Sequence, residues 1–188
     1  MKNKIIIISS PSGAGKTTIC KKLLKKIKNI ELSISYTTRQ KRKKEKEGID
    51  YYFIDKNKFS LLKRKKYFIE TAKVFDNYYG SPKNNIIKAF KNKKHILFDI
   101  DWQGAKKLRK LYNDKIILDF FILPPNKKEL KLRLEKRGRD NKQEIKKRLS
   151  LAISEISHYK EYKKVLINNK IAKTVKEIAE IIIDHSKT

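Results

Sequence analysis

The chain has 188 residues, 39% of them hydrophobic, which is enough for about one domain with a real core. The 49 lysines and arginines exceed the 20 acidic residues and give a net charge of +29. Lysine is spread over almost every predicted helix and does not gather in one patch. We therefore interpret the charge as compositional drift and expect no nucleic-acid partner. The single cysteine excludes an internal disulfide. The sequence shows no signal peptide, and no apolar run approaches the roughly 18 residues that span a membrane. We therefore expect a cytoplasmic protein with no membrane partner.

The sequence opens with a pattern of strand, glycine-rich loop and helix. The isoleucines from Ile5 to Ile8 are too short a run for a helix and predict a strand buried on both faces. The loop Ser-Ser-Pro-Ser-Gly-Ala-Gly follows, and then an amphipathic helix over 16–27. Such a loop points backbone N–H groups into one hollow at the positive end of the helix dipole, where a polyphosphate is best held. Lys16 adds a charge for the outer phosphates, and Thr17 offers a hydroxyl to a magnesium ion.

Residues 35–81 predict a small mixed insert. The polar stretch 37–48 is expected to return through Gly48 like a hairpin to an aromatic strand. Asp55 can cap a helix, and 76–82 is dense in turn formers. The strands expected in this part of the chain span 31–36, 51–54 and 67–75.

Beyond the insert, apolar strands alternate with helices, which predicts an α/β fold with a five-stranded parallel core sheet. In such a sheet ligands bind at the carboxyl ends of the strands. The remaining strands are expected at 95–101, 116–123 and 165–167, and the helices at about 82–90, 102–111, 126–137, 144–160 and 175–185.

Two carboxylates lie at the end of the strand expected at 95–101. Asp99 would stand beside a triphosphate held by the loop and could help to hold the magnesium ion. Asp101, two residues later, points from the same side. A helix cap or a solvated turn is the alternative for either residue, and for Asp99 the nearby Lys16 and Thr17 favour the functional interpretation.

Arginines are retained at a few places in a chain that otherwise uses lysine. A guanidinium group can grip the oxygens of a transferring phosphoryl group with two parallel hydrogen bonds, whereas lysine offers a point charge. An ordinary surface position is the alternative for each. The candidates are Arg39 and Arg42 in the polar loop, and Arg133, Arg137, Arg139 and Arg148 further on.

Glu70 interrupts an aromatic and apolar strand, Phe-Ile-Glu-Thr-Ala. A carboxylate in such a place needs a partner. The partner is either a lysine or a base with two adjacent donors, as guanine has in its N1–H and exocyclic amine, whereas adenine would present an acceptor. A buried polar site of this kind rejects the wrong base, because its own group is left unpaired.

Taken together, several motifs resemble those of the guanylate kinases in order and spacing, and the resemblance runs over nearly the whole chain. It implies a P-loop NTPase fold of three layers, with a core at 1–34, 82–128 and 149–188, a GMP-binding insert at 35–81 and a helical lid at 129–148. It also implies magnesium-dependent transfer of the terminal phosphoryl group of ATP to GMP, giving ADP and GDP. The motifs are SSPSGAGKTT, SYTTRQKR, GIDYYF, FIETA, NYYGSP, FDIDWQGA, ILPP, RLEKRGRD and KKRL.

The resemblance also implies roles for individual residues. The ATP phosphates would be held by Ser12, Gly13, Ala14, Gly15, Lys16, Thr17 and Thr18, with Asn168 near the adenine. Guanine would be read by Ser35, Glu70 and Asp101, and the GMP phosphate would be bound by Arg39, Arg42, Tyr51 and Tyr79, with Gly80 and Ser81 lining that pocket. Magnesium would be held by Thr17 and Asp99, partly through water, and catalysis would rest on Lys16, Arg39, Arg133, Arg137 and Arg148.

The chain departs from the family pattern in two places. Ser10 replaces the first glycine of the phosphate loop, where a small residue suffices. Lys41 and Lys44 stand where the family has proline and glycine, so we expect a looser loop that must be ordered when GMP binds.

Two alternatives remain at this point, and the sequence leaves the choice between a monomer and a homo-oligomer undecided. One is a P-loop kinase that acts on a sugar phosphate or on another nucleoside monophosphate, which Ser35, Glu70 and Asp101 together disfavour. The other is a non-catalytic module of the guanylate-kinase type that binds phosphopeptides. The retained phosphate loop and arginines argue against such a module.

Overall fold

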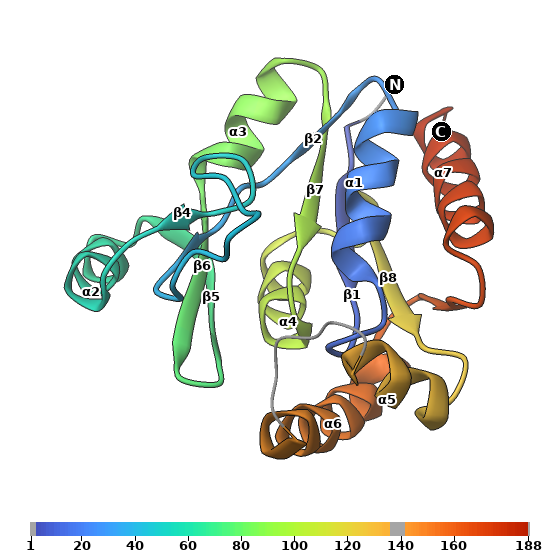
Figure 1. Ribbon diagram of the computed structural model, residues 1–188. Coiled ribbons are helices and arrows are strands. Elements are labelled where there is room, and N and C mark those ends of the chain that lie inside the picture. The colour runs from blue at the N-terminus through green and yellow to red at the C-terminus, as the bar shows by residue number, and fades with distance from the viewer. Residues whose placement is uncertain (1–2, 136–141, 188) are drawn as a thin grey trace.

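The computed structural model describes residues 3–135 and 142–187 (Figure 1). Its core is a five-stranded sheet in the order β2-β7-β1-β8-β9, and every neighbouring pair of strands is parallel. This arrangement confirms the predicted α/β fold. The strands are β1 (Ile5–Ser9), β2 (Ile30–Leu32), β7 (His95–Asp99), β8 (Ile117–Leu123) and β9 (Lys164–Ile167).

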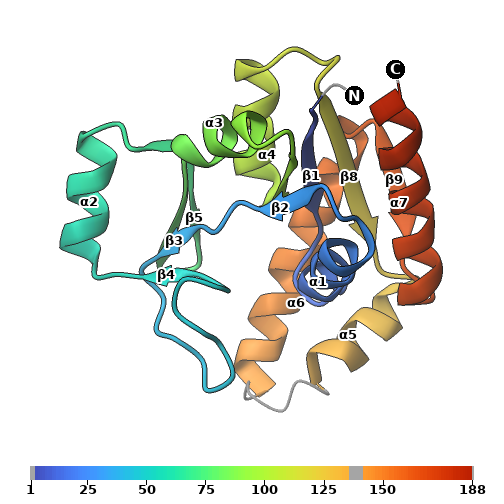
Figure 2. The ribbon, with the colours of Figure 1, turned by 90° about the horizontal axis from the view of Figure 1, so that it is seen from above.

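Helices cover both faces of this sheet, as Figure 2 shows from above. The central strand β1 is fully buried, so its alternating isoleucines serve two cores. Ile6 and Ile8 pack toward α1 (Lys16–Lys26) and α7 (Ile171–Lys187). On the other face Ile5 and Ile7 pack toward α3 (Asn84–Lys91) and α4 (Trp102–Leu111).

Two further helices lie beside the loop that follows β1. The helices α5 (Lys127–Glu135) and α6 (Lys142–Ile156) pack together through a small apolar cluster, and the 3-10 helix η1 (Ser157–Glu161) leads from α6 to β9. Asn126 accepts a hydrogen bond from the backbone N–H of Glu129 at 2.8 Å and so caps the start of α5. Arg137 and Arg139 lie outside the described residues.

The chain between the second and third core strands forms a second sheet, which stands beside the core in Figure 1. Its order is β4-β3-β6-β5, and the helix α2 (Lys56–Arg64) begins after the predicted cap, Asp55. The strands are β3 (Tyr36–Thr37), β4 (Tyr52–Phe53), β5 (Phe68–Val74) and β6 (Asn77–Pro82). We keep the name insert for residues 35–81, which supply almost all of this sheet.

The predicted single strand at 31–36 is wrong, because the chain changes sheets within it. The backbone N–H of Ser33 still bonds to Leu97 O of the core at 2.8 Å, whereas Ser35 O already accepts from Tyr52 N of the insert at 2.9 Å. Asn85, at the start of α3, lies where the chain returns from the insert to the core. Its Nδ2 donates hydrogen bonds to Ser33 Oγ at 3.1 Å and to Ile34 O at 3.4 Å, so the two ends of the insert are joined.

Two turn predictions in the insert are also wrong. The stretch 37–48 does not close a hairpin, since β3 and β4 pair in parallel. Residues 77–82 form the strand β6, which pairs with both β5 and β3. Pairing on both edges outweighs the turn propensity of these residues. The following helix begins at Asn84 and not at Ser81-Pro82, which belong to β6.

No helix in the described part of the chain is long and apolar enough to cross a membrane.

Candidate active site

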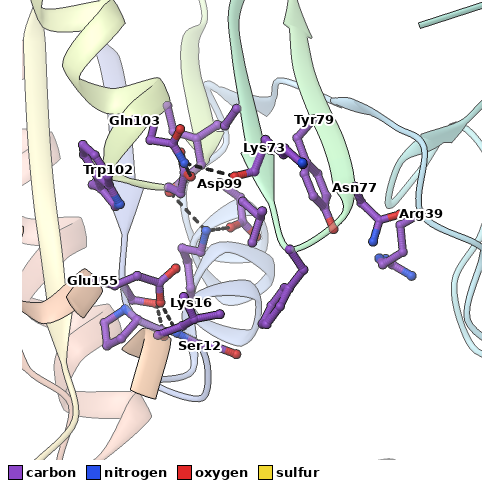
Figure 3. A pocket seen from close by; sticks show the side chains of 18 of the residues that line it. Ser12, Lys16, Arg39, Lys73, Asn77, Tyr79, Asp99, Trp102, Gln103 and Glu155 are labelled. Carbon is purple, nitrogen blue, oxygen red and sulfur yellow. Dashed lines mark hydrogen bonds and ion pairs between the residues drawn. The ribbon is translucent and has the colours of Figure 1, made fainter. Parts of the chain in front are cut away.

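A cavity of about 600 Å³ lies between the core sheet, the insert and α6. Figure 3 shows Lys16 and Asp99 near its centre, Glu155 and Ser12 on one side, and Tyr79 and Arg39 on the other. The carboxyl ends of β1 and β7 open into it, as expected for a parallel sheet. The sequence-predicted site residues that line it are Ser12, Gly13, Gly15, Lys16, Thr17, Ser35, Arg39, Arg42, Tyr51, Glu70, Tyr79, Asp99, Asp101 and Arg148.

Lys16 and Asp99 form an ion pair at the base of the cavity. Lys16 Nζ lies 2.9 Å from Asp99 Oδ1 and donates a hydrogen bond to Ile100 O at 3.1 Å. Burial alone disfavours the ammonium form, but the Asp99 carboxylate outweighs it and raises the pKa of Lys16 above its ordinary value. Lys16 therefore stays a cation, held at the point where the first helix meets the loop.

The loop from Ser10 to Gly15 is shaped by two glycines and braced from below. Gly13 and Gly15 have φ angles of 94° and 99°, a region that L side chains rarely adopt. Asn168 Nδ2 donates to Ala14 O at 2.8 Å, and a Cβ built at Gly15 would come within 2.8 Å of that same nitrogen. The loop thus rests directly on the Asn168 amide.

The structure places Asn168 beneath the phosphate loop, and its predicted position near adenine stays a prediction. The residue is fully buried, its Oδ1 accepts from Thr174 Oγ1 at 3.3 Å, and it does not line the cavity. Arg133 also stays off the cavity wall, because its guanidinium bonds to Glu129 Oε1 at 2.8 Å and to Asn168 O at 3.1 Å. Other predicted residues that do not line the cavity are Ala14, Thr18, Gly80 and Ser81.

Glu70 sits at the far end of the cavity in a chain of hydrogen bonds. Its side chain is buried, and its Oε1 accepts from Ser81 Oγ at 2.6 Å. Ser81 in turn lies 3.0 Å from Ser35 Oγ. Burial raises the pKa of Glu70 to about 7, although the Ser81 hydrogen bond acts against the shift. The three residues predicted around guanine or its pocket therefore form one connected polar unit.

Asp101 serves as a helix cap and also faces the cavity. Its Oδ1 accepts from the backbone N–H of Gly104 at 3.0 Å, and its Oδ2 accepts from Gln103 Nε2 at 2.9 Å. Asp101 also contributes to the raised pKa of Glu70, so the two carboxylates are close enough to interact. A helix cap and a carboxylate that faces the site, the two interpretations of Asp101 that the sequence left open, are therefore compatible.

The insert wall of the cavity carries positive charge. Arg39 Nη2 bonds to both oxygens of Glu45, at 2.8 and 3.0 Å, and its guanidinium lies 5.5 Å from the centroid of the Tyr51 ring. Burial lowers the pKa of Arg42, and the neighbouring charges of Arg39 and Arg148 lower it further. Neighbouring cations of this kind attract an anion.

Sequence reasoning missed two carboxylates. Glu45 holds Arg39 in place, and its signal would have been its position within the same polar loop. Glu155 lies on α6 and accepts a hydrogen bond from the backbone N–H of Ser12 at 3.0 Å, while burial raises the pKa of this carboxyl. Its only signal is a spacing of two helical turns from Arg148, which places both on one face.

The cavity also offers oxygen donors for a hard cation. No group of three or more histidines, cysteines or acidic residues in the described part of the chain could hold a metal ion alone. The exposed Thr17 hydroxyl and the Asp99 carboxylate both line the cavity beside the phosphate loop. This donor set fits magnesium, which usually combines one or two protein oxygens with water and substrate phosphates.

Comparison with known proteins gives one consistent family. A family model described as guanylate kinase matches residues 2–185. Guanylate kinase from Rickettsia felis is 47% identical over 185 residues, which are 97% of this chain and 95% of that protein. Guanylate kinase from Coxiella burnetii is 40% identical over 96% of this chain and 87% of that protein. The crystal structure of guanylate kinase from Anaplasma phagocytophilum matches with a TM-score of 0.81 and 37% identity, over 97% of this chain and 85% of that one.

Proposed function

This chain belongs to the guanylate kinase family, an enzyme family, and on that premise we propose how the cavity transfers a phosphoryl group from ATP to GMP. The proposal rests on one observation, the two different sites at opposite ends of the cavity. A buried carboxylate bonded to Ser81 faces the Lys16 phosphate loop across one cavity of about 600 Å³. One end suits a base with adjacent donors, and the other suits a polyphosphate.

On the acceptor side, Glu70 receives the N1–H and exocyclic amine of guanine, with Ser35 and Asp101 beside it. The GMP phosphate lies against Arg39 and Arg42, since the insert wall is where positive charges converge. Tyr51 and Tyr79 support this site, with their rings 5.9 Å apart. Adenine would present an acceptor to the Glu70 carboxylate in place of the two donors of guanine, which makes the wrong base costly.

On the donor side, the ATP phosphates lie in the glycine loop. The N-terminus of α1, which has no side-chain cap, the dipole of that helix and the Lys16 ammonium all favour negative charge there. Thr17 and Asp99 would hold a magnesium ion, which supplies charge neutralisation of the outer phosphates when bound.

Catalysis on this proposal consists of positioning and charge stabilisation. An oxygen of the GMP phosphate attacks in line, and no general base is needed because the acceptor is already an anion. Lys16, Arg39 and Arg148 stabilise the charge on the transferred group, with Arg133 and Arg137 brought in by closure of the lid at 129–148. Closure of the insert and lid over the core excludes the water that would otherwise hydrolyse ATP.

The cytoplasmic location expected from the sequence remains a prediction.

The test is release of ADP from magnesium-ATP with GMP, AMP, CMP, UMP and a sugar phosphate as separate acceptors. We expect turnover with GMP and at least a hundredfold less with the others. Equal turnover with AMP would contradict the guanine-reading role of Glu70. Turnover with the sugar phosphate alone would contradict the proposed acceptor.

A further inference from the structure

The hairpin between β5 and β6 has an unusual residue at its tip. Val74 pairs with Asn77, so Phe75 and Asp76 alone make the turn. Phe75 has a φ angle of 53°, in the left-handed region that favours glycine, and a bulky aromatic residue is rarely found there. Such backbone strain persists only where the surroundings determine it, and it points to a role for the side chain.

The Phe75 ring contacts cations on α6, on the other side of the cavity mouth. Its centroid lies 5.3 Å from Arg148 Cζ and 5.9 Å from Lys147 Nζ. These distances fall within the range of cation–π attraction. All three residues line the cavity, and Figure 1 shows the β5–β6 hairpin reaching toward the end of the molecule where α6 lies. The contact therefore joins the insert to the part of α6 that lies within the predicted lid.

The position of Arg148 is electrostatically demanding. Arg148 lies close enough to Arg42 to contribute to the lowered pKa of that guanidinium. Two cations on opposite walls of an anion site repel one another until the anion arrives, so the placement of Arg148 needs favourable contacts of its own. The face of the Phe75 ring provides one.

We propose that Phe75 is a positioning residue that holds Arg148 over the cavity and so couples the GMP-binding insert to the phosphoryl-transfer machinery. The proposal rests on the proposed function, since it takes Arg148 to act on the transferred group. It explains why an aromatic side chain occupies a turn position that glycine would fill without strain.

Three substitutions separate the ring from the backbone strain. Phe75→Gly relieves the strain and removes the ring, Phe75→Leu keeps the strain and the apolar bulk without the π face, and Phe75→Trp keeps the face. We expect kcat to fall about tenfold in the first two and to stay within about twofold of the parent in Phe75→Trp, with KM for ATP nearly unchanged. The melting temperature of Phe75→Gly should equal or exceed that of the parent.

Tyr67→Leu is the matched control, because Tyr67 is an aromatic residue of the insert whose ring contacts are with Tyr36 and Phe68, within the same sheet. Its kcat should match that of the parent. If Phe75→Gly and Phe75→Leu kept the parental kcat, Phe75 would be only a structural turn residue, and the inference would fail.

A double-mutant cycle tests the partner. In an Arg148→Met background, Phe75→Leu should lower kcat by less than twofold, because the group that the ring positions is already gone. Full additivity of the two substitutions would overturn the inference. Absence of any GMP-dependent turnover by the parent protein would instead overturn the proposed function, so the two failures are distinguishable.

Discussion

Gly104 lies directly against the Glu70 carboxylate. A Cβ built at Gly104 would come within 2.7 Å of Glu70 Oε2 and 3.1 Å of its Cδ, distances at which one of the two residues must move. Gly104 belongs to the first turns of α4 in the core, whereas Glu70 belongs to β5 of the insert. The absence of a side chain at Gly104 therefore sets how closely the Glu70 carboxylate, which we propose binds guanine, can approach the core helix.

The first prediction follows from this contact. Gly104→Ala should favour the α4 helix by about 1 kcal/mol on intrinsic propensity, yet displace Glu70. We expect KM for GMP to rise about tenfold while KM for ATP changes by less than twofold, as measured by steady-state kinetics with each substrate varied. Lys106→Ala, at an exposed position of the same helix, is the control. An unchanged KM for GMP in Gly104→Ala would contradict the proposed place of guanine.

The raised pKa of Glu70 predicts a pH dependence of GMP binding. Guanine offers donors, so the ionised carboxylate is the binding form, and with a pKa of about 7 its population falls about tenfold from pH 8 to pH 6. KM for GMP should rise by about that factor as the pH is lowered. Glu70→Gln should bind GMP weakly at all these pH values. The GMP phosphate titrates in the same way with the parent and with Glu70→Gln. If KM for GMP changed with pH equally in both proteins, the effect would come from the phosphate and not from Glu70.

The same shift predicts a stability effect of defined sign. The folded protein keeps a proton on Glu70 up to about pH 7, whereas the unfolded chain releases it near the ordinary pKa of 4.5. The contribution of this group is therefore fully present below about pH 4.5 and is lost as the pH rises to 7, by an amount on the order of 3 kcal/mol. Denaturant unfolding of the parent and of Glu70→Gln across this range should diverge, and parallel profiles would show that Glu70 titrates normally.

Lys16→Ala tests the ion pair at the phosphate loop. Loss of the ammonium should lower kcat by about a thousandfold, because it removes a charge placed on the transferred group. The circular dichroism spectrum should remain that of the parent. Lys21→Ala is the control on the same helix, since Lys21 pairs with Asp50 and does not line the cavity. Activity near the parental level in Lys16→Ala would remove this residue from the mechanism.

Asn168→Ala tests the brace beneath the loop. The substitution removes the hydrogen bond to Ala14 O and leaves a buried carbonyl unpaired, at a cost of about 1–3 kcal/mol. A loosened loop should raise KM for ATP about fivefold or more and lower the melting temperature by several degrees, with KM for GMP little changed. The neighbouring exposed residue supplies the control, Asn169→Ala. If Asn168→Ala raised only KM for GMP, the brace would not act on the ATP site.

The elements that the sequence predicted well are those whose signals are local. The four isoleucines of β1, the glycines before Lys16 and the Asp55 cap each carry their structure within a few residues. The errors occur where distant partners decide. Residues 77–82 have turn composition, but strands on both sides make them β6. Likewise, nothing near residue 34 shows that the chain leaves one sheet there for another.

The same distinction holds within the cavity. Lys16, Asp99 and Glu70 stood out because their side chains conflict with apolar surroundings or complete a motif. Glu155 gave almost no signal, because one carboxylate on a charged amphipathic helix looks like any other until the fold carries it to the Ser12 N–H. The contact of Asn168 with the phosphate loop could not be foreseen, because Asn168 and Ala14 are 154 positions apart in sequence.

The tie between Asn85 and the Ser33–Ile34 crossing has an evolutionary consequence. The insert leaves the core and returns to it at points held together by hydrogen bonds, so the core need not distort to receive it. A segment whose ends are already neighbours can be lengthened, shortened or exchanged at a small entropic cost. The insert, which we propose selects the acceptor, can therefore change in length and sequence while the core sheet stays the same.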